Sequence, residues 1–321
     1  MAGTETTIKI FHDLSRFRDH IDTCRQPAIL KGYDLGRCLE QWRNPAYFMD
    51  KVGDCKEAKV HVVAKDEVDR MDFLAKNFNY VSMNLKQLVS SIFIDSDDAN
   101  DDKYYLRSLG DDPRGQIKAD FNSDFPALAS DFKFDPSDFF EAGRFFSSVL
   151  RLSSSGVRVW THYDIMDNVY AQIVGRKTAI LWPPNEALNL YLDGDKSRVV
   201  DLADPHLDVK YPKLKLASKY LADLDPGDIL FIPALWFHNM KAIDAGIAIN
   251  VFWKNLQDDS FYDKKDPYGN KDVVPGAKAL RMLDNVWHQL DDLPEEFRDF
   301  YGRKLIARLE AKCLSKKDIT E

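Results

Sequence analysis

Three side chains in the second half of the sequence could together bind a metal ion. His162 and Asp164 lie two residues apart at the end of a predicted strand, so both should point to the same face. His238 follows an apolar strand that starts at a Pro-Gly-Asp turn. Two imidazoles and one carboxylate are typical ligands of non-haem Fe(II), and they also suit catalytic zinc. The pattern predicts a metal centre and leaves the metal open.

A lysine at the start of an apolar strand bears on the choice of metal. Lys177 precedes the run 178–182, which is almost wholly apolar. If it points into a barrel it needs an anion, which a dicarboxylate co-substrate would supply, whereas on an edge strand it would extend outward into solvent. A zinc hydrolase needs a separate general base, while an oxygenase needs an anchor for the acid that reduces oxygen. Lys177 and a tyrosine of the Tyr104–Tyr105 pair favour the oxygenase.

Residues 156–254 predict the β-structure that must position these side chains. Runs rich in Val, Ile, Trp, Phe and Tyr alternate there with Gly, Pro and Asp turns, as in a β-sandwich or barrel. The expected strands are 157–163, 169–174, 177–182, 228–233 and 247–253. Gly175 and Arg176 lie between two of them and predict a two-residue hairpin turn. We expect Trp160, Trp182, Trp236 and Trp253 to pack in the core. The region before these strands is expected to be mixed α/β.

The C-terminal segment predicts two helices with apolar faces. Ala277, Leu280, Leu283, Val286 and Leu290 recur at helical spacing. A second helix is expected from Pro294 in its first turn, with apolar residues at Phe297, Tyr301, Leu305 and Leu309. Two consecutive apolar faces need a surface to cover them, so the sequence predicts a homodimer built mainly from this segment.

The charge composition opposes a generally basic nucleic-acid-binding protein. The 321-residue chain has 44 Lys and Arg against 52 Asp and Glu, a formal net charge of -8. Two local clusters could still form basic faces, or belong to ordinary mixed-charge surface. They are Arg303–Lys304, Arg308, Lys312 and Lys316–Lys317, and a second set of Lys103, Arg107, Arg114 and Lys118.

The four cysteines show no close pairing, and no apolar run approaches the ~20 residues that span a bilayer. We therefore expect an intracellular protein without a membrane segment, in the cytoplasm or else the nucleus.

The motifs around these residues resemble the JmjC family of Fe(II)- and 2-oxoglutarate-dependent oxygenases. The shared pattern consists of Thr161-His162-Tyr163-Asp164, Asn168, Lys177 and Pro-Gly-Asp…Phe-Ile-Pro-x-x-Trp-x-His ending at His238. The similarity covers nearly the whole chain, including segments 103–110, 145–148, 268–272 and 293–301, and is strongest to the tRNA-hydroxylating members. It is weakest near the N-terminus and around 115–142.

The resemblance implies a fold and a set of site residues. The fold would be mainly β with added helices: a double-stranded β-helix, or cupin-like jelly roll, over residues 1–275 and a helical dimerisation region over 276–321. His162, Asp164 and His238 would hold Fe(II), and Lys177 would pair with the distal carboxylate of 2-oxoglutarate. Tyr105 and Asn168 would hydrogen-bond the same co-substrate, and O2 would be the other reactant.

The resemblance also implies an activity, for which alternatives remain. A tRNA-hydroxylating member would act on phenylalanine tRNA, at the amino-carboxypropyl side chain of a wybutosine precursor on the guanosine beside the anticodon. A JmjC protein hydroxylase or histone lysine demethylase would share every site residue. A non-catalytic cupin-like interaction module would be expected to lack Lys177 or one metal ligand, and the sequence retains all of them.

Overall fold

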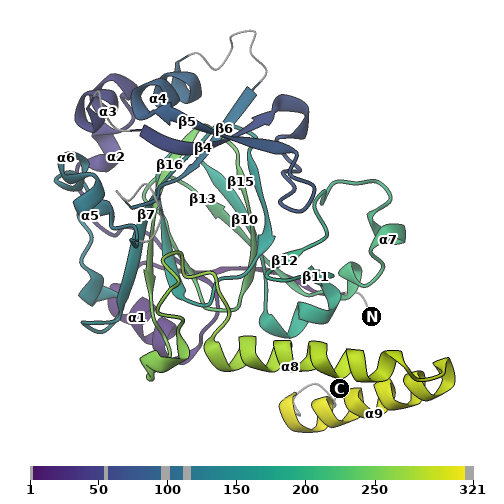
Figure 1. The fold of residues 1–321 in the computed structure, drawn as a ribbon. Coiled ribbons are helices and arrows are strands. Elements are labelled where there is room, and N and C mark those ends of the chain that lie inside the picture. The colour runs from purple at the N-terminus through teal and green to yellow at the C-terminus, as the bar shows by residue number, and fades with distance from the viewer. Residues whose placement is uncertain (1–2, 54–56, 95–101, 111–116, 315–321) are drawn as a thin grey trace. The chain divides into compact units, whose positions relative to one another are not determined.

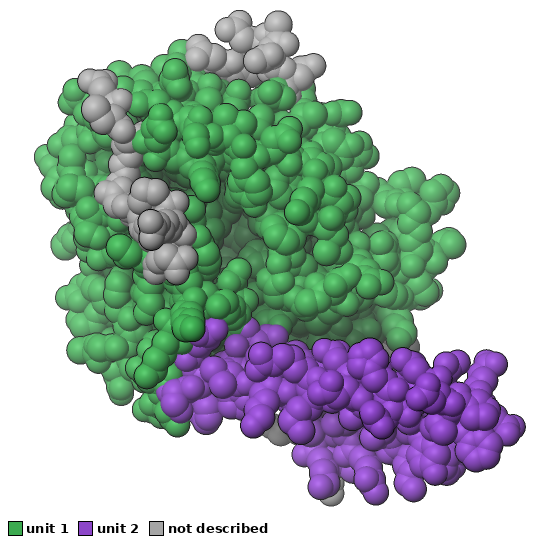
Figure 2. All heavy atoms as spheres, viewed as in Figure 1, with its two compact units in different colours: residues 1–259, 264–271 green, residues 260–263, 272–321 purple. Residues whose placement is uncertain are grey.

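The computed structural model describes residues 3–53, 57–94, 102–110 and 117–314, and the chain divides into two compact units. Unit 1 comprises residues 1–259 and 264–271, and unit 2 comprises residues 260–263 and 272–321 (Figure 2). The described strands all lie in unit 1, whereas the last two α-helices lie in unit 2. The predicted division after residue 275 remains a proposal about domain organisation.

The described strands of unit 1 form two sheets, one of seven and one of nine strands (Figure 1). The seven-stranded sheet runs in the order β1 (Glu5–Thr7), β13 (Lys219–Leu224), β10 (Lys177–Trp182), β15 (Phe237–Ala242), β8 (Arg158–His162), β12 (Lys196–Ser197), β11 (Leu192–Asp193). The nine-stranded sheet runs in the order β2 (Lys9–Phe11), β3 (Ala28–Leu30), β14 (Ile229–Ile232), β9 (Asp167–Val174), β16 (Gly246–Trp253), β7 (Phe145–Ser153), β6 (Asp102–Arg107), β4 (Glu57–Ala64), β5 (Phe78–Asn84). The predicted fold class, mainly β with added helices in a double-stranded β-helix, is confirmed.

The helices of the described chain are mostly short. The α-helices are α1 (Leu14–Thr23), α2 (Cys38–Gln41), α3 (Pro45–Val52), α4 (Leu85–Phe93), α5 (Phe121–Asp124), α6 (Pro126–Ala129), α7 (Leu207–Lys210), α8 (Val274–Asp291) and α9 (Glu295–Cys313). The 3-10 helices are η1 (Lys65–Glu67), η2 (Pro136–Asp138), η3 (Pro184–Asn189), η4 (Leu214–Leu216) and η5 (Asp259–Phe261). Asp13, Asn44 and Asn84 precede α1, α3 and α4, and each side chain accepts a hydrogen bond from the first-turn backbone.

The nine-stranded sheet separates two apolar cores. On its outer face, side chains such as Leu150, Val169 and Ile249 pack with residues of α1, α2, α3 and α4. On its inner face, Tyr170 and Ala248 pack with residues of the seven-stranded sheet. Successive residues of a strand point to opposite faces, so the alternation along β9 and β16 produces both cores. Polar residues on the inner-facing positions therefore lie between the two sheets.

One predicted connection is wrong in its pairing. Gly175 and Arg176 do form a tight turn after β9, and Gly175 has a φ of +74°, which suits glycine. The turn is not a hairpin, because β9 pairs with β14 and β16 while β10 pairs with β13 and β15. It carries the chain from one sheet to the other. The five predicted strands themselves are present within two residues of their expected ends.

Unit 2 contains α8 and α9, and none of the residues of these two helices is buried in the single chain. The sequence predicted Pro294 in the first turn of the second helix, but it occupies the N-cap position just before α9. Several large apolar side chains on the two helices are exposed: Leu280, Met282, Trp287, Phe297, Phe300 and Ile306. Across the described residues, none of the helices is both long and apolar enough to cross a membrane.

Candidate metal centre and adjoining cavity

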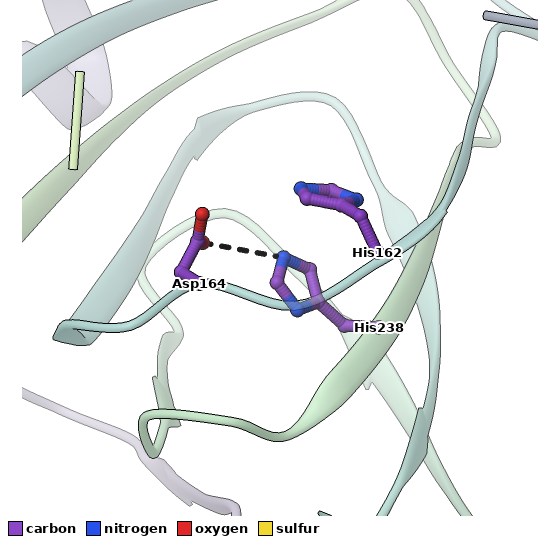
Figure 3. Close-up of side chains that lie close together, drawn as sticks. All are labelled: His162, Asp164 and His238. Carbon is purple, nitrogen blue, oxygen red and sulfur yellow. Dashed lines mark ion pairs between the residues drawn. The ribbon is translucent and has the colours of Figure 1, made fainter. Parts of the chain in front are cut away.

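The pairing of two strands brings the predicted metal ligands together. His162 ends β8, and its register partner on the neighbouring β15 is His238; Asp164 follows two residues after His162. The candidate ligand atoms of the three residues all lie within 4.8 Å of one another, and Figure 3 shows the side chains converging. The Nε2 of His238 is 3.6 Å from a carboxylate oxygen of Asp164. These three residues form a set that could hold a metal ion.

Backbone carbonyls fix the orientation of both imidazoles. The Nδ1 of His162 donates to the carbonyl of Trp160 at 2.9 Å, and that of His238 donates to the carbonyl of Trp236 at 3.1 Å. Because a carbonyl can only accept, each ring keeps its proton on Nδ1 and leaves the Nε2 lone pair for a metal. The backbone N–H of Leu235 donates to the carbonyl of Asp164 at 2.8 Å, which holds the carboxylate segment beside β15.

The surroundings keep the imidazoles neutral. Burial, and then the neighbouring His162, lower the pKa of His238 to about 4. Burial also lowers the pKa of His162, although the Asp164 carboxylate opposes that shift. Neutral imidazoles are the form that binds a metal, so the site is prepared for one at neutral pH.

Lys177 lies on the inward face of β10 and is only 5% exposed. Its Nζ lies 5.2 Å from the centre of the Tyr170 ring, and Ala179 and Leu181 on the same face belong to the core between the sheets. Within the described parts of the chain, no carboxylate forms an ion pair with it. Burial, and then the positive charge of Arg151, lower its pKa to about 7. The outward-pointing alternative for this lysine is therefore wrong.

Asn168 and Tyr105 belong to one hydrogen-bonded chain on the inner face of the nine-stranded sheet. Arg151 bonds the hydroxyl of Tyr105 and donates to the side-chain oxygen of Asn250 at 2.8 Å. Asn250 in turn donates to the side-chain oxygen of Asn168 at 2.9 Å. The Nδ2 of Asn168 and the hydroxyl of Tyr170 are buried without a hydrogen-bond partner among the described residues. Unmatched buried polar atoms of this kind are available to a bound ligand or water.

Sequence reasoning missed Arg151 and Asn250, although a signal was present. Each is a polar residue inside a strand whose neighbours are mostly apolar, as Lys177 is. The same test that selected Lys177 would have selected them. Trp182, Trp236 and Trp253 are buried as predicted, but Trp160 is only partly buried and also lines a cavity.

A cavity of about 650 Å³ adjoins the metal centre. Its inner wall includes His162, Asp164, Tyr105 and Arg151. The remaining wall includes Arg107, Phe73, Tyr80, Trp160, Asp195, Lys196 and Tyr268. The volume falls within the range of pockets that bind small organic ligands.

One of the two predicted basic surfaces is partly wrong. Arg107 lines this cavity, where one guanidinium N–H donates to the Tyr268 carbonyl at 3.2 Å, so it is not a surface contact for phosphate. Its side chain points inward because it alternates with Leu106, which packs in the outer core. Lys103 and Lys118 remain, while Arg114 lies outside the described residues, as do Lys316 and Lys317 of the other cluster.

Comparison with known proteins identifies the family. A family profile described as a cupin-like domain matches residues 14–259. The chain belongs to the cupin-like domain family.

Several relatives of this cupin-like protein are similar to it over most of its length, and their names are related. The tRNA wybutosine-synthesizing protein 5 of Homo sapiens is 43% identical over 98% of this chain and 99% of its own length. The protein of the same name in Danio rerio is 44% identical over 96% of this chain and 92% of its own length. The tRNA wybutosine-synthesizing protein 4 of Gibberella zeae is 36% identical over 89% of this chain, but only 27% of that protein is matched. The predicted relationship to tRNA-modifying members is confirmed.

Proposed function

We propose that this protein is an Fe(II)- and 2-oxoglutarate-dependent hydroxylase of phenylalanine tRNA. It acts on the amino-carboxypropyl side chain of a wybutosine precursor, on the guanosine beside the anticodon. The observation that carries the proposal is Lys177, buried without a carboxylate partner in the described chain and set between the same two sheets as the His-Asp-His set. The names of the relatives support an enzyme of wybutosine synthesis.

Fe(II) fits the donor set of His162, Asp164 and His238, because two neutral imidazoles and one carboxylate suit this ion and leave coordination positions open. When bound, the iron supplies oxygen activation coupled to the oxidative decarboxylation of 2-oxoglutarate. The overall reaction converts 2-oxoglutarate, O2 and a substrate C–H into succinate, CO2 and C–OH. The chain contributes fixed ligand orientation through the carbonyls that accept from both Nδ1 atoms.

The co-substrate is held by the polar residues between the sheets. The Lys177 ammonium binds the distal carboxylate of 2-oxoglutarate, and the Nδ2 of Asn168 and the hydroxyl of Tyr105 donate to the same molecule. Asn250 orients Asn168, since its amide occupies the Asn168 oxygen and leaves the Nδ2 hydrogens to the ligand. Arg151 positions both Asn250 and Tyr105.

The tRNA needs a basic surface even though the whole chain is acidic. Arg303, Lys304, Arg308 and Lys312 are exposed on α9 and are our first candidates. Arg303 already pairs with Asp299 at 2.8 Å, so Lys304 and Arg308 are the better phosphate contacts. A tRNA substrate supports a location inside the cell, in the cytoplasm or else the nucleus.

The exposed apolar residues of α8 and α9 support a homodimer. In the single chain these helices leave Leu280, Met282, Phe297 and Phe300 between 51% and 59% exposed. Apolar helix faces of this kind are usually covered by a partner surface. Light scattering at micromolar concentration should give twice the chain mass, and a monomer would contradict this part of the proposal.

The proposed function is tested by supplying iron, 2-oxoglutarate and either precursor-bearing tRNA or histone peptides. Mass spectrometry should show one added oxygen on the tRNA, with succinate formed in equal amount, and Asp164→Ala should abolish both. Oxygen added to a peptide and not to tRNA would favour a protein hydroxylase or demethylase. No oxygen on either, with metal and 2-oxoglutarate both bound, would favour a non-catalytic module.

A further inference from the structure

The cavity is larger than the proposed co-substrate would require even if that molecule lay wholly inside it. Of the residues assigned to the co-substrate, Tyr105 lines this cavity, whereas Lys177 and Asn168 are not among its lining residues. If each non-hydrogen atom takes at most the ~30 Å³ of a liquid water molecule, the ten such atoms of 2-oxoglutarate fill no more than about 300 Å³. The cavity measures about 650 Å³. Its lining includes residues that the proposed metal and co-substrate roles do not use: Arg107, Asp195, Phe73, Tyr80 and Trp160.

Arg107 brings a positive charge to the cavity wall, and no carboxylate of the described chain forms an ion pair with it. It is the register partner of Arg151 on the adjacent strand, but Arg151 is occupied by Tyr105 and Asn250. Arg107 bonds the Tyr268 carbonyl and lies 5.5 Å from the centre of that ring. In the part of the chain that the structure describes, it has no carboxylate ion pair. A partly buried guanidinium without an ion-paired carboxylate is costly, and an anionic ligand would reduce that cost.

Asp195 supplies the opposite charge, close to the metal centre. It lies in the turn between β11 and β12, and the next residue, Lys196, is the register partner of His162. The Asp195 side chain is 25% exposed and pairs with the ammonium of Lys196. That ammonium also lies 4.4 Å from the centre of the Phe73 ring. The carboxylate thus lines the cavity with free acceptor capacity beyond one lysine bond.

Aromatic rings form the rest of this wall. Trp160 stacks on Phe78 with ring centres 5.7 Å apart and planes within 11°. Phe73 lies 5.2 Å from Trp160, and Tyr80 is 57% exposed. Stacking of a nucleobase on such side chains contributes about 1–3 kcal/mol per base. An enzyme that modifies a base must take it out of the nucleic-acid stack, and an aromatic pocket can receive it.

We propose that the outer part of the cavity binds an aromatic base carrying an amino-acid side chain, with Arg107 pairing with its carboxylate, Asp195 with its ammonium, and Trp160 stacking on the base. This inference rests on the proposed function and names the parts of the substrate that are recognised. It explains why charges of both signs and an aromatic wall share one cavity with the His-Asp-His set.

The test compares three tRNA probes for binding to the full-length protein in the presence of 2-oxoglutarate and without iron. One probe carries the precursor with its free amino-acid side chain, the second carries the methyl ester of that side chain, and the third carries its N-acetyl form. Wild-type protein should bind the free form about 10–100-fold more tightly than either derivative, as expected for a lost charged hydrogen bond. Equal affinity for all three probes would overturn the inference.

Variants assign each charge to its partner. Arg107→Gln should weaken binding of the free form about 10–100-fold but leave binding of the methyl ester unchanged. Asp195→Asn should weaken binding of the free form by a similar factor but leave binding of the N-acetyl form unchanged. Arg107→Lys should recover part of the loss. Asp193→Asn and Arg198→Gln are matched controls, since both residues are exposed on the same hairpin and pair with each other, and neither should alter selectivity.

Trp160→Ala should weaken all three probes by a similar factor, about tenfold, because the base is common to them. Equal losses on free and blocked probes in Arg107→Gln and Asp195→Asn would show a structural role and overturn the assignment. A raised 2-oxoglutarate requirement in Arg107→Gln with unchanged tRNA binding would place Arg107 with the co-substrate instead. Failure of the proposed function is seen separately, as absence of added oxygen when iron is supplied to the wild-type protein with the free-form probe.

Discussion

The two faces of the nine-stranded sheet differ in the side chains they carry: the outer face is apolar, and the inner face includes many polar residues. The outer face carries Leu150, Val169 and Ile249, which are fully buried under helices. The inner face carries Arg151 and Tyr105, which line the cavity, and Asn168, which joins them through Asn250. Four buried side-chain atoms lack a hydrogen-bond partner in the described chain, and all belong to inner-facing residues: Ser147, Asn168, Tyr170 and Gln172.

The difference shows where stability and function reside. Apolar burial on the outer face stabilises the fold, whereas unmatched polar groups on the inner face lower its stability. A polar network is tolerated at such a cost when a ligand completes it. Substitutions on the two faces should therefore have opposite consequences, and five predictions examine that contrast.

The largest expected effect is at the metal centre. Asp164→Ala should lower turnover roughly a thousandfold or more, equivalent to ~4 kcal/mol in the barrier, because the only carboxylate of the set is lost. Its melting temperature should stay close to that of the wild type. His206→Ala, on the exposed start of α7, is the control and should retain full activity. An active Asp164→Ala protein would remove the triad assignment.

On the outer face, Leu150→Ala should lower the free energy of unfolding by about 2–5 kcal/mol, since the side chain is fully buried and leaves a cavity. Denaturant titration measures this loss. The 2-oxoglutarate affinity of the folded variant should remain within about twofold of the wild type. A large loss of affinity would show that the two faces are not independent.

One residue further along β7, Arg151→Met should do the reverse. Replacing this partly buried cation with an apolar side chain of similar length removes a desolvated charge but leaves two polar partners unmatched, so the unliganded protein should stay about as stable as the wild type. Co-substrate binding should be strongly reduced, because Tyr105 and Asn250 lose their shared partner. Calorimetry checks both quantities. Strong destabilisation with intact 2-oxoglutarate binding would reverse our view of the inner face.

Lys177→Ala should raise the 2-oxoglutarate requirement about 10–100-fold, or ~1.4–2.8 kcal/mol, through loss of a charge-assisted bond. Binding of tRNA should be little changed. Lys219→Ala on the neighbouring β13 is the matched control, because that lysine pairs with Glu5 near the surface. If tRNA binding falls while the 2-oxoglutarate requirement is unchanged, Lys177 contacts phosphate and the co-substrate lies elsewhere.

The last expected effect is a pH dependence of co-substrate affinity. Burial lowers the pKa of Lys177 to about 7 in the free protein, and a bound carboxylate favours the ammonium and raises that pKa. The affinity should be fully present below pH 7 and fall by up to ~tenfold per unit as the pH rises above 7. Titration calorimetry should show proton uptake, and Lys177→Arg should flatten the profile. Constant wild-type affinity from pH 7 to 9 would contradict this account.

Local patterns were sufficient for part of the site. The i, i+2 spacing predicted that His162 and Asp164 share a face, and an apolar run after a cation identified Lys177 as inward-pointing or on an edge. The helices of unit 2 were also predictable from their apolar spacing. These inferences succeeded because strand and helix periodicity depend on neighbours in the chain.

Other features depended on which strands pair. The sequence alone determined that an imidazole–carboxylate pair, a second histidine and a lysine at the start of an apolar strand were available. Only the tertiary structure decided that β15 pairs with β8, which sets His238 opposite His162, and that Gly175 begins a crossing between sheets rather than a hairpin. It also places Arg107, which was expected on a basic surface, in the wall of the cavity. The physical reason is that strand partners are chosen by the burial of whole faces, which no short window of sequence contains.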